Sequence, residues 1–226
     1  MKTVFRIALF SLFALALYSC GTTRYYGGFK PASASEGMVL LGPVSEIHFI
    51  DGNNHSFYDD SLSIVSEEMI MSILQGMYQL PIDHTVPLDT VQRERVALFS
   101  HALLNESESG RGALPIPVVL DNLLEDEGSR YGIMVFANGF VRDKKGIRKD
   151  AAKGVGLAIM SAVLTLGNAV YISTPITCLS SVSVAILDSK TNSVVFYDIE
   201  TGEDKDPTNR SDVRRQLKEI FSDFIE

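Results

Sequence analysis

The sequence predicts a single α/β sandwich domain with a mixed β-sheet packed by helices. An apolar run without alternation, residues 131–141, is typical of a central strand that is covered on both faces. Two further apolar runs at 182–187 and 194–199 flank a polar turn, which indicates a hairpin. Apolar stripes with helical spacing at 62–77 and 213–224 predict helices that dock on this sheet.

Two short apolar runs at 38–41 and 47–50 come first, separated by Gly42-Pro43. The second run predicts a strand. Residues 51–54, Asp-Gly-Asn-Asn, favour a turn, because these residue types bond their own backbone and tolerate positive φ. The sequence therefore predicts a strand and a turn before the first helix.

The first helix has candidate N-caps at Asp59, Asp60 and Ser61. Its apolar stripe comprises Leu62, Val65, Met69, Ile73 and Met77. Methionines suit an adaptable binding groove, but the stripe has the width of an ordinary buried face. We therefore expect the stripe to pack in the core.

Two more helices are expected before the central strand. One covers residues 89–104 and is followed by a polar loop at 105–112. Its inward side chains are Val96, Phe99 and Leu103. A shorter helix is expected at 115–127, where Asp121, Glu125, Asp126 and Glu127 form an acidic cluster that we interpret as a solvated face.

The remaining elements follow the central strand. Asn138-Gly139 indicates a bulge or bend within that strand, and 201–209 is expected to be a polar loop. The last helix starts near Ser211 and should dock on the sheet. Its apolar stripe comprises Val213, Leu217, Ile220, Phe221 and Phe224.

The N-terminal segment has the three parts of an export signal. Lys2 and Arg6 form a positive region, and residues 7–17 are apolar except for Ser11. This stretch is too short to span a bilayer as a helix. Together with Leu17-Tyr-Ser-Cys20 it resembles a bacterial lipoprotein signal peptide with its lipobox. The resemblance implies diacylglycerol on the Cys20 sulfur, cleavage before Cys20 and an acylated new N-terminus.

This interpretation sets the expected organisation of the chain. Residues 1–19 are the signal, 20–37 are a Gly/Ser/Thr-rich flexible tether and 38–226 are the α/β domain. Gly21 follows the cysteine, where Asp resembles an inner-membrane retention signal in enteric bacteria. We therefore expect an outer-membrane protein that is anchored to membrane lipid through Cys20 and faces the periplasm.

Composition narrows the classes of partner. Removal of the signal, with its two basic residues and no acidic one, changes the formal charge from −8 to −10. Such acidity argues against binding nucleic acid through its phosphates. Acylation of Cys20 leaves Cys178 as the one other cysteine, so no intramolecular disulfide is expected. We interpret Cys178 as a small buried hydrophobe rather than a reactive thiol.

Residues 154–172 form an apolar insert without a charged residue. Gly154, Ala158 and Ala162 recur every four residues, which is typical of close helix packing and makes them candidates for membrane or oligomer contact. Three interpretations stay open: burial in the fold or an oligomer, association with the membrane, or a spanning helix. Burial is favoured because small and polar residues dilute the hydropathy and the preceding basic residues suit a cytoplasmic flank.

The sequence contains no recognisable catalytic or metal-binding motif. GxSxG, P-loop, HExxH and CxxC patterns are absent. Asp51, Asn53 and His55 lie close together, but a calcium loop requires more carboxylates and a glycine where Ser56 stands. We therefore expect a non-enzymatic protein without cofactor or metal.

The segment Val-Ala-Ile-Leu-Asp-Ser-Lys-Thr-Asn-Ser-Val-Val-Phe at 184–196 resembles a hairpin of bacterial envelope lipoproteins. With the order of elements over 47–226, it is similar to the curli-secretion-channel lipoprotein superfamily and its small relatives. Asn192 stands where glycine is common there. The resemblance implies a mixed-sheet sandwich, self-association and an accessory role in envelope transport or assembly.

The leading functional hypothesis is an oligomerising, non-enzymatic accessory of envelope assembly or secretion, whose partner is itself or another envelope protein. A second hypothesis is a lipoprotein that binds a small or lipidic molecule at the face near Met69 and Met77. The third is a hydrolytic enzyme, for which a cleft gathering histidine and carboxylates would be required.

Overall fold

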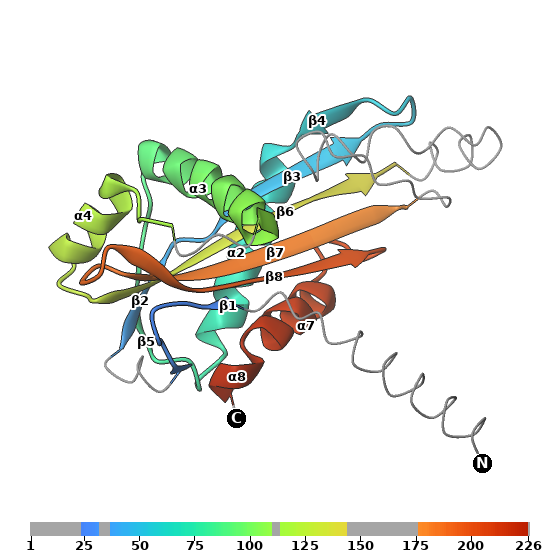
Figure 1. Cartoon of the computed structure of the whole chain (residues 1–226). Helices are drawn as coiled ribbons and strands as arrows, with labels where there is room; N and C mark the ends of the chain where they lie inside the picture. The colour runs from blue at the N-terminus through green and yellow to red at the C-terminus, as the bar shows by residue number, and fades with distance from the viewer. Residues whose placement is uncertain (1–23, 32–36, 110–113, 144–175, 226) are drawn as a thin grey trace, which may run out of the picture.

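The computed structural model describes residues 24–31, 37–109, 114–143 and 176–225. All eight strands in these ranges belong to one mixed sheet, which helices cover on both faces (Figure 1). The strands are β1 Arg24–Tyr25, β2 Met38–Leu41, β3 Val44–Ile50, β4 Ser56–Tyr58, β5 Ile82–Val86, β6 Tyr131–Arg142, β7 Cys178–Asp188 and β8 Ser193–Glu203. The helices are α2 Asp60–Gln75, α3 Thr90–Ser109, α4 Val118–Asp126, α7 Arg210–Ile220 and α8 Ser222–Ile225.

The central strand is β6, as predicted. It pairs antiparallel with β7 along one side, and on its other side it pairs in parallel with both β2 and β3. The β7–β8 hairpin is also confirmed, and β1 adds to the outer edge of β8. At the other edge the sheet divides, because β5 pairs with β2 whereas β4 pairs with β3.

The bulge expected at Asn138-Gly139 lies elsewhere. β6 pairs with β7 without a register shift through these residues. Leu40 of β2 pairs with Ile133 and Val44 of β3 pairs with Phe136. The two residues are four positions apart, whereas their partners on β6 are three positions apart. One extra residue therefore lies between β2 and β3, at Gly42-Pro43. Proline has no N–H to donate to a ladder, which explains the position of the break. Gly139 is required instead for close approach, because a Cβ there would lie 2.1 Å from the Leu179 carbonyl oxygen.

Two apolar clusters confirm the sandwich. Ile133 and Val135 of β6 face α2 and α7, whereas Met134 and Phe136 face α3 and α4. Successive strand residues point to opposite faces, so an apolar run without alternation fills both layers. In Figure 1, α3 and α4 lie on one side of the sheet and α7 and α8 on the other.

The helices α3 and α4 occur where the sequence predicts them. Val96, Phe99 and Leu103 of α3 are buried, as predicted. The helix continues to Ser109, so the loop expected at 105–112 begins too early. The strands β4 and β5 were not predicted, because each is short and exposed along much of its length.

The stripe predicted for α2 is wrong in part. Asp59 is its N-cap, but Val65 is 47% exposed and the buried face comprises Ser63, Ser66, Ile70, Ile73 and Leu74. The N-terminal half of α2 covers the edge of β3 that β4 leaves unpaired. There Ser63 Oγ accepts a hydrogen bond from the Ile47 N–H, and Ser66 Oγ accepts one from Ser45 Oγ. Open strand edges need polar partners, so serines occupy positions that periodicity assigns to apolar residues.

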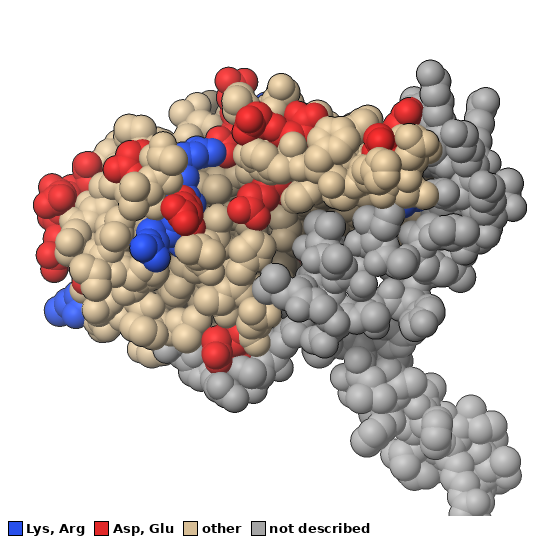
Figure 2. All heavy atoms as spheres, turned by 90° about the horizontal axis from the view of Figure 1, so that it is seen from above, with Lys and Arg blue, Asp and Glu red and all other residues tan. Residues whose placement is uncertain are grey.

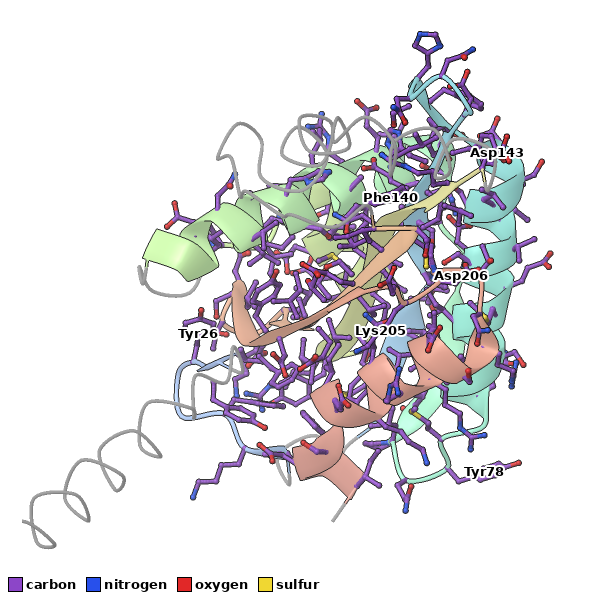
Figure 3. All side chains as sticks on the ribbon, turned by 90° about the vertical axis from the view of Figure 1, so that its right-hand side faces the viewer. Tyr26, Tyr78, Phe140, Asp143, Lys205 and Asp206 are labelled. Atoms are coloured by element: carbon purple, nitrogen blue, oxygen red, sulfur yellow. The ribbon has the colours of Figure 1, made fainter. Side chains whose placement is uncertain are left out.

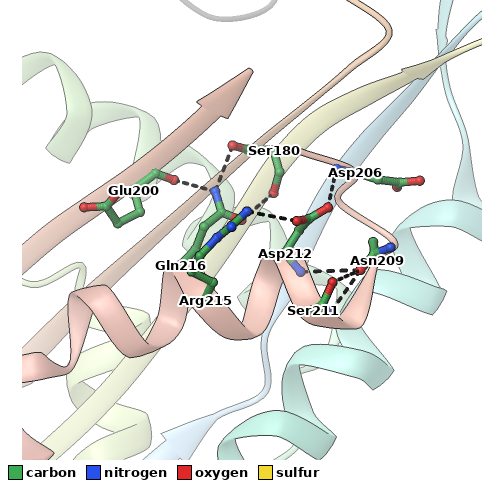
Figure 4. A network of polar contacts seen from close by, with 8 residues as sticks. All are labelled: Ser180, Glu200, Asp206, Asn209, Ser211, Asp212, Arg215 and Gln216. Atoms are coloured by element: carbon green, nitrogen blue, oxygen red, sulfur yellow. Dashed lines mark hydrogen bonds and ion pairs between the residues drawn. The ribbon is translucent and has the colours of Figure 1, made fainter. Parts of the chain in front are cut away.

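The last helix docks as predicted, with Val213, Leu217, Ile220 and Phe221 buried. One buried polar side chain adds to this contact (Figure 4). Gln216 Nε2 donates to the carbonyl oxygens of Ser180 and Glu200, both at 2.9 Å, and Gln216 Oε1 accepts from Ser180 Oγ at 2.9 Å. The Asn209 side chain caps the helix by accepting from the N–H groups of Ser211 and Asp212. The polar loop before it is shorter than expected, because β8 continues to Glu203.

Part of the expected tether belongs to the fold. Of residues 20–37, the structure describes 24–31 and 37, and Arg24–Tyr25 forms β1 on the edge of β8. Phe29 is only 8% exposed and packs in the core beside Tyr131. The aromatic residues of a Gly/Ser-rich segment therefore bind the domain, contrary to the prediction of a flexible tether throughout.

Several sequence predictions fall outside the described residues. These are the signal and Cys20, and the apolar insert at 154–172 with Gly154, Ala158 and Ala162. Among the helices within the described ranges, none has the length and apolar character needed to cross a bilayer.

Candidate functional site

An open groove lies between α3 and the β3–β4 hairpin. Its volume is about 470 Å³, within the range of small-molecule sites. The lining residues are Val44, Ser45, Glu46, Tyr58, Arg93, Glu94, Ala97, Leu98 and His101. The groove therefore combines an apolar floor with a histidine, carboxylates and a guanidinium.

The polar groups of the groove are held in pairs. His101 Nε2 lies 3.1 Å from Glu46 Oε2, which joins α3 to β3. Arg93 of α3 forms an ion pair with Glu67 of α2, and Glu67 Oε1 also accepts the Ser45 N–H at 2.9 Å. These contacts connect both helical layers across the edge of the sheet. The Arg93 guanidinium is therefore paired with a carboxylate from the opposite helical layer.

A second, much smaller cavity lies beneath His101. Its volume is about 10 Å³, the size of one water molecule. The His101 ring packs edge-on against Phe136 in its wall, with ring centroids 5.3 Å apart. A cavity of this size admits no organic ligand, so the binding capacity of this region is confined to the open groove.

The groove gathers the histidine and carboxylates that an enzyme hypothesis requires. A His–Glu pair is suited to acid–base chemistry. However, the partner recorded for His101 is a carboxylate, and the nearby Ser45 hydroxyl is buried and donates to Ser66. Among the described residues, the arrangement supplies a proton-transfer pair and no activated nucleophile.

The four histidines are dispersed over the molecule. His48 bonds Ser56 Oγ, His55 pairs with Asp51, and His84 lies 3.0 Å from Glu127. The Asp51 carboxylate accepts the N–H groups of Asn53 and His55, which holds its pKa below the ordinary value. The segment 51–55 is therefore the predicted turn, organised by its own backbone. Within the described ranges no cluster of three metal-ligating side chains occurs.

The methionine face does not form a deep apolar pocket. Met77 is buried in the core and Met69 packs against it. A groove of about 480 Å³ beside Met77 is as large as the groove beside α3, but polar residues, among them Asp83 and His84, form more of its lining. The ligand-binding hypothesis therefore has two candidate grooves, of which the one beside α3 is the more apolar.

Cys178 begins β7 and is partly exposed. Burial raises the pKa of its thiol, partly offset by a hydrogen bond from Thr177. A raised pKa disfavours the nucleophilic thiolate. This agrees with the interpretation of Cys178 as an unreactive thiol, but the expectation that it is buried is wrong.

The groove residues were missed by sequence reasoning because they are far apart in the chain. Glu46 and His101 are separated by 55 positions and meet only because α3 packs over β3. One local signal was present: His101 lies one helical turn from Ala97, on the margin of the predicted inner face. A polar residue at such a margin commonly faces a partner element rather than solvent.

Comparisons with known proteins give only distant likenesses. No family model matches the sequence, and no curated protein matches it. A PelC dodecamer from Paraburkholderia phytofirmans has 8% identity and a TM-score of 0.38, covering 89% of this chain and 94% of that chain. A single-substitution variant of that dodecamer has 10% identity and a TM-score of 0.39, with coverage of 90% and 98%. A DUF4136 family protein from Bacteroides thetaiotaomicron has 10% identity and a TM-score of 0.31, with coverage of 90% and 95%.

Proposed function

We propose that the chain is a lipid-anchored, periplasm-facing envelope protein that acts as a non-enzymatic, self-associating accessory in envelope assembly or secretion. The observation that carries self-association is the β4 edge. Among the described strands β4 pairs only with β3, and its Phe57 and Tyr58 are 47% and 49% exposed. A free strand edge bearing aromatic rings is a surface for pairing with another chain.

The proposed interface adjoins the groove. Tyr58 lines the groove, and the Phe57 ring packs at a tilt against Phe49 with ring centroids 5.5 Å apart. A partner strand on β4 would cover both aromatic rings and complete the backbone ladder of the hairpin. The groove and the edge would then form one continuous interaction surface.

The test uses the mature-length chain with Cys20→Ser, so that acyl chains do not cause association. Light scattering on a sizing column should give an oligomer, and Phe57→Lys should convert it to monomer because edge lysines block strand pairing. Val118→Lys is the control, since Val118 is 69% exposed on α4, which lies at the other end of the sheet from β4 (Figure 1). A strict monomer that crosslinks to no envelope protein would contradict the proposal.

A second candidate function is binding of a small ligand in the groove beside α3, favoured by its volume and its His101–Glu46 pair. Binding should be lost on Leu98→Trp, which fills the groove, and retained on Val118→Trp, an exposed site on α4. Native mass spectrometry of the protein from cells would detect a retained molecule. Equal occupancy in both variants would dismiss the groove as its site.

A further inference from the structure

The segment that follows the predicted lipid attachment is fixed to the domain. Tyr26 N–H donates to the Val195 carbonyl at 2.9 Å, and Tyr25 Oη donates to Asp223 of α8 at 2.7 Å. Tyr25 also packs on Phe196 with ring centroids 5.2 Å apart. Burial and the contact with Asp223 raise the pKa of the Tyr25 phenol, so it stays a donor at neutral pH. The chain cannot pivot freely at Arg24.

This attachment limits how far the domain can stand from a membrane. Cys20 precedes Arg24 by four residues, which span at most about 14 Å when fully extended. With the acyl chains of Cys20 in the bilayer, the region around β1 must lie close to the headgroups. The elements bound to this region are α8, through Asp223, and α7, which precedes it directly.

The outward face of α7 is basic. Arg210, Arg214, Arg215 and Lys218 are exposed, together with one acidic residue, Glu219, opposite the buried Val213, Gln216, Leu217 and Ile220. Arg215 pairs with Asp212 at 3.1 Å, and no ion pair is recorded for Arg214 or Lys218 among the described residues. Figure 3 shows α7 beginning beside Asp206 and running toward α8.

Helix stability explains only part of this basic character, because the helix dipole favours Lys218 in the last turn of α7. Cations in the first turn oppose the helix dipole, whose positive end lies there, and Arg210 occupies the first position of α7. The chain as a whole has a formal charge of −8. On the opposite side of the sheet, the face seen in Figure 2 shows far more Asp and Glu than Lys and Arg. The described part of the face over α3 and α4 is therefore acidic, whereas the exposed side chains of α7 are mainly basic.

We propose that the exposed basic face of α7 docks on the phosphate headgroups of an anionic bilayer and sets the orientation of the domain. The inference rests on the proposed lipid anchor for its geometry, and charge complementarity identifies the surface. Gln216 holds α7 rigidly to β7 and β8 (Figure 4), so the basic face is presented as a fixed plane. The acidic side, with the groove and β4, then remains available to partners.

The test measures sedimentation of the mature-length Cys20→Ser chain with vesicles of equal parts phosphatidylethanolamine and phosphatidylglycerol. Each Lys or Arg at an anionic surface increases partitioning about fivefold. The double variant Arg214→Gln/Lys218→Gln should therefore bind about 25-fold more weakly at low salt. Binding should also fall in about 1 M salt, where screening acts over about 3 Å.

A matched control removes the same charge elsewhere. Arg95→Gln/Lys190→Gln alters exposed residues of α3 and the β7–β8 turn and should bind as the parent chain does. An equal loss of vesicle binding in both double variants would show that net charge alone determines binding, and it would overturn the proposal. Binding that is the same on pure phosphatidylcholine vesicles, or insensitive to salt, would also overturn it.

The lipid anchor is tested separately, by incorporation of labelled fatty acid into the full-length chain. Failure of labelling at Cys20 would contradict the proposed function while leaving the vesicle result intact. Labelling with no vesicle binding by α7 would retain the anchor and reject the orientation.

Discussion

The helices α2 and α7 lie on the same face of the sheet, yet they dock by different means. α7 buries an apolar stripe over β7 and β8 and adds one polar contact, through Gln216. α2 begins over a strand edge, where Ser63 and Glu67 bond the backbone of β3, and only its second half enters the core. A helix on a sheet face is governed by apolar periodicity, whereas a helix on a sheet edge must also satisfy backbone polar groups.

The largest expected effect lies in the apolar contact of α7. Leu217 is fully buried, so Leu217→Ala should lower the free energy of unfolding by about 2–5 kcal/mol, through lost burial and a residual cavity. Urea denaturation of the mature-length chain measures the change. The exposed neighbour Arg214→Ala should change stability by less than about 0.5 kcal/mol. Similar losses in both variants would mean that α7 docks on another face.

The next effect concerns the polar contact of α7. Gln216→Met keeps the volume but leaves the carbonyl oxygens of Ser180 and Glu200 without their donor. Burying unpaired acceptors should cost about 1–3 kcal/mol. Amide exchange should show faster opening of α7 with little change in the core of β6. An unchanged free energy of unfolding in Gln216→Met would indicate that the buried amide fixes the position of α7 on the sheet without adding stability.

Edge docking by α2 predicts a larger loss of stability at the buried Ser63 than at the half-exposed Val65. Ser63→Ala removes the acceptor for the Ile47 N–H and should cost about 1–2 kcal/mol. Val65→Ala, in the stripe that periodicity assigns to the core, should cost less than about 0.5 kcal/mol because Val65 is half-exposed. A larger loss of stability in Val65→Ala than in Ser63→Ala would show that the predicted apolar stripe is the buried face of α2.

The same contrast explains what the sequence could predict. The central strand and the C-terminal hairpin follow from continuous apolar runs, and α7 follows from helical periodicity, since the burial of all three is apolar and local in sequence. The strand break at Gly42-Pro43 and the short strands β4 and β5 depend on pairing with distant strands. The groove depends on the packing of α3 over β3, which brings His101 to Glu46. Tertiary proximity of this kind has no periodic signature in a single sequence.

The smallest expected effect is a pH dependence where α7 meets β8. Partial burial, reinforced by Glu219 and Asp198, raises the pKa of the Glu200 carboxyl above its ordinary value. The folded state therefore holds this proton more tightly than the unfolded state, and the free energy of unfolding falls as pH rises from the unfolded pKa through the folded one.

Glu200→Gln should remove this component and flatten the decline in stability as pH rises above the ordinary pKa of a glutamate, because the amide has no charge to desolvate. The backbone carbonyl of Glu200, which accepts from Gln216, is kept in the variant. Glu203→Gln, an exposed site at the end of β8, is the control and should leave the slope unchanged. A steeper decline in Glu200→Gln would show that the carboxylate stabilises the α7 contact when charged, opposite to the effect expected from burial beside Glu219.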